Sequence, residues 1–226
     1  MTLSDSVEQV YRQFGGYSCP PDLWVCEQCG PEWSADDIRA TPVRSLSLPQ
    51  LVAVHVMSVD DDTLRYFVPR LMELMLTTPA PVFDFRMSDL AGRLPLWRPQ
   101  EQTAVRRFAE AVWSELLTRH PAALGYFSDV PTALDLLEWC GLSVIGHLDA
   151  LRAAETPAAA LNLADLVDVV CTTKEPFESV SGAMVFTWLR DAATGDRLEQ
   201  AFFGADSPET ARRLSDAHEL WAVCCR

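Results

Sequence analysis

Apolar side chains recur along this chain at intervals of three and four residues, the spacing that places them on one face of an α-helix. The clearest stripe follows residue 99, where charged residues lie largely off the apolar face. Stripes of this kind point inward, toward a core. The pattern predicts that these large side chains are buried: Phe14, Leu51, Phe67, Leu71, Phe108, Val112, Leu137, Trp188 and Trp221.

Helix boundaries are marked by capping residues. Asp5 followed by Glu8 has the spacing of a capping box and predicts a first helix that ends at Gly15. Ser34 and Ser47 each begin another such pattern, so we expect helices to start directly after them.

A longer helix is predicted from Thr63 to Met75, with Pro69 inside it. Proline lacks a backbone N–H and its ring clashes with the preceding helical turn. We therefore expect a kink or a break near Phe67.

The second half of the chain predicts shorter helices at 131–140, 143–154 and 157–170, followed by three around Trp188, Leu198 and Trp221. No segment shows β-branched alternation between hairpin turns. The expected fold is all-α, with ten to twelve short antiparallel helices in a helical bundle or a HEAT-like α/α superhelix. We expect one domain over 1–226, with a division into subdomains near the proline-rich breaker at 78–98.

Composition and charge narrow the classes of function. The chain has 226 residues and a net charge of −14, which disfavours binding to the phosphate backbone of nucleic acids. No run of apolar residues is long enough to span a membrane, and the N-terminal residues lack the pattern of a secretory signal. We therefore expect a cytoplasmic protein whose seven cysteines are reduced.

Sequence motifs of common enzyme classes do not occur. The chain has no phosphate-binding loop, no dinucleotide-binding glycine pattern, no HExxH and no GxSxG elbow. Its four histidines are scattered singly, an arrangement more typical of helix faces and caps than of catalysis. The sequence favours a protein that is not an enzyme.

The most suggestive cluster of reactive residues is an early turn that contains Cys26 and Cys29. A CxxC pair brings two sulfurs to one centre, as zinc binding or a redox disulfide requires. A structural zinc site needs two further ligands, and no second cysteine or histidine pair follows at the usual spacing. His55, Cys140 and Cys171 join this pair only if the fold brings them there.

The alternative is that these thiols are small apolar fillers of a turn, which is fixed by its prolines and Gly30 and packed by Trp24 and Trp33. The sequence favours this alternative and no cofactor, because only two ligands stand at metal spacing. A structure in which the sulfurs of Cys26 and Cys29 converge with Cys19 and a histidine would contradict this alternative.

A second cluster pairs Arg70 with Glu73, three residues apart on the helix that contains Pro69. In one interpretation the two form an ion pair on the helix surface. In the other, the Pro69 kink presents Arg70 to a groove, where it binds a carboxylate of a partner. Arg70 and Glu73 are therefore candidate binding residues.

Several motifs resemble those of a family of uncharacterised bacterial proteins. They are Tyr11-x-x-Phe14, Cys26-x-x-Cys29, Arg44-x-Leu46 and the run from Tyr66 to Leu74, together with helices that carry Trp113, Trp139 and Trp188. Members are similar in an early cysteine pair and an LPRxxEL-like helix, in which Val68 here replaces leucine. The resemblance implies an all-helical, cytosolic protein and no particular activity.

The sequence thus favours a non-enzymatic protein-interaction module whose acidic surface binds a basic protein partner, as an immunity-type or adaptor protein does. The alternative hypothesis is a metal-binding or redox protein that uses Cys26 and Cys29.

Overall fold

The computed structural model describes residues 1–30, 32–56, 58–79, 90 and 92–225. Helices make up 67% of this part, which contains no strand. The all-α class is therefore confirmed. The predicted division near 78–98 falls largely on residues 80–89 and 91, which lie outside the described residues.

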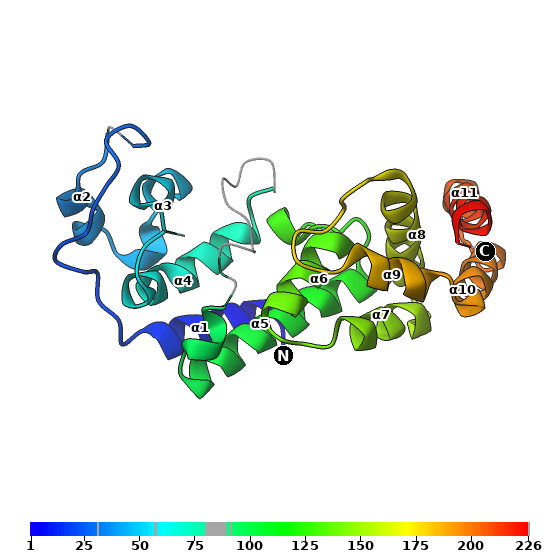
Figure 1. Cartoon of the computed structure of the whole chain (residues 1–226), viewed down its shortest axis with the longest axis horizontal. Coiled ribbons are helices and arrows are strands. Elements are labelled where there is room, and N and C mark those ends of the chain that lie inside the picture. Colours follow the sequence, from blue (N-terminus) through cyan, green and yellow to red (C-terminus); the bar gives the residue numbers. More distant parts are fainter. Residues whose placement is uncertain (31, 57, 80–89, 91, 226) are drawn as a thin grey trace. The chain divides into compact units, whose positions relative to one another are not determined.

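The chain divides into two compact units, described separately here. The first comprises Met1–Phe108 with Leu124–Tyr126, and the second comprises Ala109–Ala123 with Phe127–Arg226. Helix α5 (Pro99–Thr118) begins in the first unit and ends in the second (Figure 1). None of the helices in the described ranges combines the length and the apolar character that crossing a membrane requires.

The first unit is built on α4, against which α1 and α3 pack. Its helices before α5 are α1 (Leu3–Phe14), α2 (Ala35–Ala40), α3 (Leu48–Val54) and α4 (Asp61–Met75), with 3₁₀ turns at η1 (Val43–Ser45) and η4 (Leu94–Leu96). The expected boxes at Ser34 and Ser47 are present. The first helix starts earlier than predicted, because Thr2 is its cap and Asp5 is the third helical residue of the box.

Helix α4 runs without a break from Asp61 to Met75, so of the predicted kink or break near Phe67 the break is wrong. Phe67, Leu71 and Met75 are almost completely buried. Burial of such side chains stabilises by about 1.5–3 kcal/mol each, enough to offset the backbone hydrogen bond that Pro69 cannot make.

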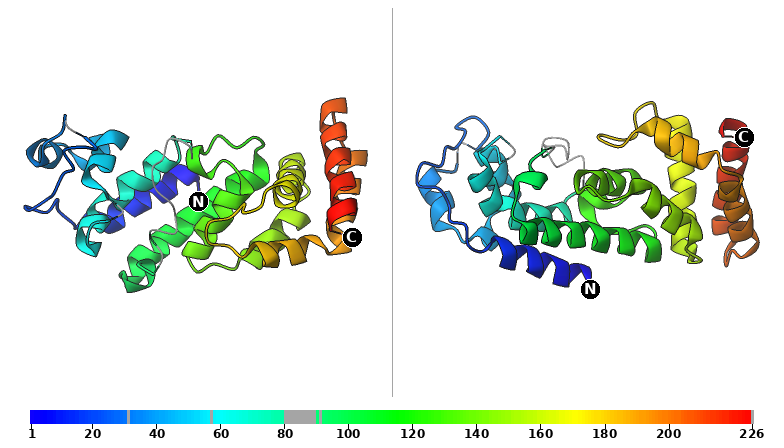
Figure 2. Two further views of the ribbon diagram at one scale, coloured as in Figure 1. Left: turned by 45° about the horizontal axis from the view of Figure 1, so that its top comes forward. Right: turned by 60° about the horizontal axis from the view of Figure 1, so that its bottom comes forward.

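In the second unit α8 is the central helix, against which each of the other helices after α5 packs (Figure 2). The helices after α5 are α6 (Val130–Trp139), α7 (Val144–Ala153), α8 (Pro157–Thr172), α9 (Gly182–Leu189), α10 (Ala192–Phe203) and α11 (Pro208–Cys224), and η5 is Gly125–Phe127. Buried Asp135 of α6 accepts three backbone hydrogen bonds from residues 178–180, at 2.8–2.9 Å, and so fixes the loop that leads into α9.

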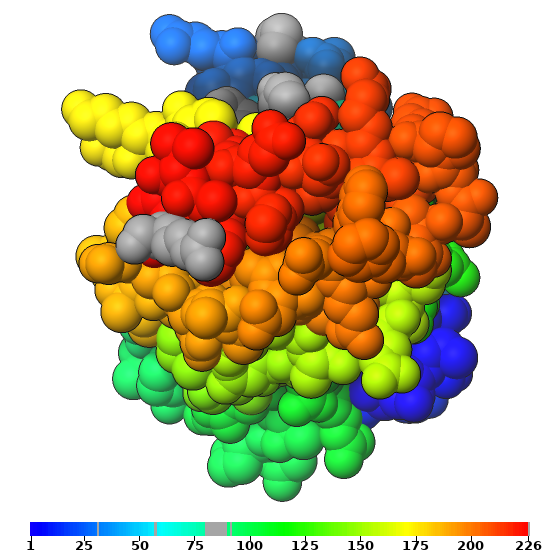
Figure 3. Space-filling view, turned by 90° about the vertical axis from the view of Figure 1, so that its right-hand side faces the viewer, coloured from blue at the N-terminus to red at the C-terminus, as the bar shows by residue number. Residues whose placement is uncertain are grey.

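Helices α10 and α11 form a hairpin, and Figure 3 shows α11 (red) lying directly against α10 (orange). A Cβ atom at Gly195 of α10 would come within 2.3 Å of the Trp221 ring, so only glycine allows this contact. Trp221 also donates a hydrogen bond from its indole nitrogen to the Leu189 carbonyl at 2.7 Å. All nine side chains predicted to form the core are buried.

Candidate metal centre

The cysteine turn lies against the end of α3. The Cys26 N–H donates a hydrogen bond to the Ala53 carbonyl at 2.8 Å, and the Gly30 N–H donates to the Cys26 carbonyl at 3.1 Å. A Cβ atom at Gly30 would lie only 2.4 Å from the Ala53 Cβ atom. Hydrogen bonding and close approach at Ala53 therefore set the position of the turn, two residues before His55.

His55 is placed by the end of the same helix. It caps α3 in the left-handed conformation (φ 52°, ψ 50°), and its N–H donates to the carbonyls of Leu51 and Val52. Non-glycine residues adopt this conformation rarely, mostly at turns and helix ends. It ends α3 at Val54, and the His55 imidazole lies beside the cysteine turn.

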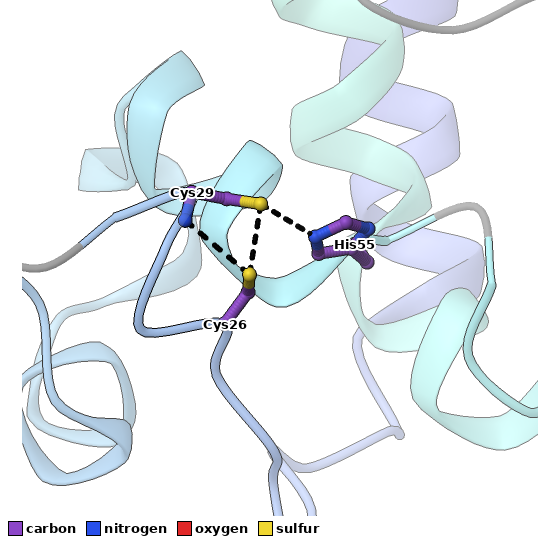
Figure 4. Close-up of side chains that lie close together, drawn as sticks. All are labelled: Cys26, Cys29 and His55. Carbon is purple, nitrogen blue, oxygen red and sulfur yellow. Dashed lines mark hydrogen bonds between the residues drawn. The ribbon is translucent and has the colours of Figure 1, made fainter.

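The two thiols and the imidazole converge (Figure 4). Cys26 Sγ lies 2.8 Å from Cys29 Sγ, which in turn lies 2.9 Å from His55 Nε2. All three ligand atoms lie within 4.8 Å of one another, the only such group of three cysteine, histidine or acidic residues in the described part of the chain. The predicted pair thus gains His55 as a third member through the fold.

Electrostatics at the turn favour a thiolate. A hydrogen bond with the Cys29 side chain is the largest of the effects that lower the pKa of Cys26 to about 7, and hydrogen bonds with His55 and with backbone groups act in the same direction. Thiolate is the form of cysteine that binds metals. The turn therefore holds a thiol that loses its proton near neutral pH.

The exposure of side chains in the turn does not agree with the interpretation in which the thiols are small apolar fillers. Cys26 is buried, but Cys29 is exposed and is therefore not a filler of the core. Trp24 does not pack into the turn as expected: 65% of its surface is exposed, and its ring centroid lies 5.8 Å from that of His55. Hydrophobic packing does not explain the positions of Cys29 and Trp24.

The other cysteines that the sequence singled out are not members of this group. Cys19 is not a member, and burial raises its pKa. Cys140 and Cys171 belong to the second unit. Cys171 Sγ lies 3.9 Å from Cys225 Sγ, and burial is the largest of the effects that raise the pKa of both thiols. These thiols are poor metal ligands compared with Cys26.

Arg70 and Glu73 lie elsewhere in the first unit and form the expected ion pair at 2.6 Å. Arg70 also donates to the Leu46 carbonyl at 2.6 Å, and the Tyr11 hydroxyl donates to Glu73 at 2.7 Å. These contacts tie α1 and residue 46 to α4, rather than forming an isolated surface pair. The binding of a partner by Arg70 and Glu73 stays a prediction.

A further histidine takes part in a charged network in the second unit. His120 Nε2 lies 2.8 Å from a carboxylate oxygen of Asp165, whose other oxygen pairs with Arg213. The three side chains border a cavity of about 290 Å³. Because Asp165 lies on α8 and Arg213 on α11, the network joins these two helices to the segment after α5.

Comparison with known proteins gives no relative. No family, no curated protein and no solved structure matches this chain. The resemblance to a bacterial helical family therefore stays an expectation, and any functional conclusion rests on the residues themselves.

Proposed function

We propose that this chain is a zinc-binding protein with Cys26, Cys29 and His55 as ligands. The observation that carries the proposal is the convergence of two sulfurs and one imidazole nitrogen within 4.8 Å. Thiolate and imidazole together suit zinc, whereas magnesium and calcium prefer oxygen ligands. His55 lies 26 residues beyond Cys29, so the fold and not a local motif completes this set.

Zinc at this position would fasten the cysteine turn to the end of α3. The turn has little regular structure between α1 and α2, and its side chains from 27 to 29 are exposed. Its contacts with α3 are the hydrogen bond from Cys26 and the packing of Gly30 at Ala53, and a metal would add to them. Metal binding contributes directly to folding in sites of this type. The proposed role is to hold the turn in place within the first unit, with three ligands in the described part of the chain, one fewer than a purely structural zinc site has.

The proposal predicts one tightly bound zinc per chain. Metal analysis of the purified protein after dialysis should give a stoichiometry near one, and Cys29→Ser should lose it, because serine supplies no thiolate. Cys19→Ser is the matched control: it removes a thiol from the same segment but outside the group, and should retain the metal. Zinc that is absent from the unaltered protein, or that survives in Cys29→Ser, would contradict the proposal.

The net charge of −14 favours a second function, the binding of a basic protein by a non-enzymatic cytosolic module of the immunity or adaptor type. Affinity capture from the native cell should recover a protein of net positive charge. Its association rate should fall as salt concentration rises, since salt screens long-range attraction. An acidic partner, or association that is insensitive to salt, would argue against this function.

A further inference from the structure

The two sulfurs of the cysteine turn are closer together than two zinc ligands are. Cys26 Sγ and Cys29 Sγ lie 2.8 Å apart, and the Cys29 N–H donates a hydrogen bond to Cys26 Sγ at 3.3 Å. Two sulfurs bound to one tetrahedral zinc, each at about 2.3 Å from the metal, lie about 3.8 Å apart. In a disulfide the two sulfurs are about 2.05 Å apart. The observed distance falls between these values, so the turn holds the pair within reach of both states.

The two sulfurs differ in their access to solvent. Cys29 is exposed, whereas only 9% of Cys26 is exposed. Cys26 is also anchored, because its N–H donates a hydrogen bond to the Ala53 carbonyl at 2.8 Å. A small oxidant from solvent therefore reaches Cys29 first, and Cys26 Sγ is already beside the sulfur that it oxidises. These positions suit a reactive cysteine and the resolving cysteine that completes a disulfide with it.

We infer that Cys26 and Cys29 form a redox switch, in which a peroxide oxidises the pair to a disulfide and the zinc is released. This inference rests on the proposed function, because release requires bound zinc. Zinc is held by thiolate, and the sulfurs of a disulfide carry no such charge. Of the three proposed ligands only His55 is unchanged by the oxidation. Oxidation therefore unfastens the cysteine turn from the end of α3.

The reaction balances with hydrogen peroxide as the oxidant. Cys29 thiolate attacks one peroxide oxygen, so that an S–O bond forms and the O–O bond breaks. The departing hydroxide takes a proton from solvent and becomes water. Cys26 thiolate then attacks Cys29 Sγ, the S–S bond forms, the S–O bond breaks, and a second hydroxide leaves and is protonated by solvent. The two sulfurs lose two electrons in total, and one peroxide is reduced to two waters.

The experiment uses the Cys19→Ser protein loaded with one equivalent of zinc. This variant keeps Cys26 and Cys29 as the only thiols between Arg12 and Arg39, so trypsin isolates the pair in one peptide. Hydrogen peroxide is titrated in, released zinc is measured with a chromophoric chelator, and the peptide is weighed after the remaining thiols have been alkylated. One zinc should be released for each disulfide found in this peptide. Excess of a small thiol should reduce the disulfide and restore the binding of added zinc.

Failure of the switch and failure of the zinc site give different results. Zinc that stays bound after the addition of peroxide, or that leaves while the disulfide forms between Cys171 and Cys225 instead, would overturn the switch alone. Protein that takes up no zinc before peroxide is added would refute the proposed function, and the switch with it.

The order of the two cysteines is tested with two further variants in the Cys19→Ser background, each of which lacks one sulfur ligand. In Cys26→Ser the exposed Cys29 should accumulate as a sulfenic acid that a cyclic diketone traps, because the resolving sulfur is absent. In Cys29→Ser little adduct should form at Cys26, because this residue is buried. Equal amounts of adduct in the two variants, or more at Cys26, would contradict the assigned order.

Discussion

Gly30 is a residue of the cysteine turn that packs against Ala53 of α3. The sequence identified this glycine as part of a turn, but its structural role is close packing against Ala53, where a Cβ atom would lie 2.4 Å from that of Ala53. The same Cβ atom would lie 3.3 Å from the Trp33 side chain. A methyl group here must push the turn away from the helix that positions His55.

Gly30→Ala should therefore weaken zinc binding. Overpacking of this kind costs about 1–3 kcal/mol, which corresponds to a loss of affinity of about five-fold to about 150-fold. Competition with a chromophoric chelator measures the effect. Gly16→Ala is the control, because no atom lies within 4 Å of the Cβ position at Gly16. Equal zinc affinity of the two variants would show that the approach to Ala53 does not shape the site.

The third ligand shows what sequence alone leaves open at this scale. The pair Cys26 and Cys29 was identifiable because their three-residue spacing is local. His55 lies 26 residues beyond Cys29 and was one of several residues that only the fold could bring close. The hydrogen bond from Cys26 to Ala53 makes that connection, and no local pattern encodes a backbone contact between a turn and a helix end.

Helices were largely predictable because their signals are local. The boxes at Ser34 and Ser47 each precede a helix in the structure. The predicted start of α1 lies too late in the chain. Two pairs, Thr2 with Asp5 and Asp5 with Glu8, both have the spacing of a capping box, and the structure uses the first. Only the backbone conformation of residue 2 distinguishes the two.

Pro69 illustrates a local signal that tertiary packing overrides. Proline in a helix interior predicts a break, yet α4 continues because its apolar face is buried on both sides of that residue. Arg70 and Glu73 add contacts with Leu46 and Tyr11 at the same level of the helix. Residues distant in sequence stabilise this helix, and the sequence of the helix alone does not reveal them.

At the scale of the whole molecule, the division into two units was not foreseeable from composition. Its first crossing falls between Phe108 and Ala109, inside an unbroken α5 that has no glycine or proline near that point. Such a boundary depends on which residues contact one another, and not on the flexibility of the chain. The three proposed zinc ligands all belong to the first unit.

X-ray absorption spectroscopy at the zinc edge of the purified protein tests the metal site most directly, because it reports the atoms bound to the metal. The proposed site predicts two sulfur atoms at about 2.3 Å, one imidazole nitrogen at about 2.0–2.1 Å and one further nitrogen or oxygen atom. A shell of four sulfur atoms, or a shell without sulfur, would contradict ligation by Cys26, Cys29 and His55.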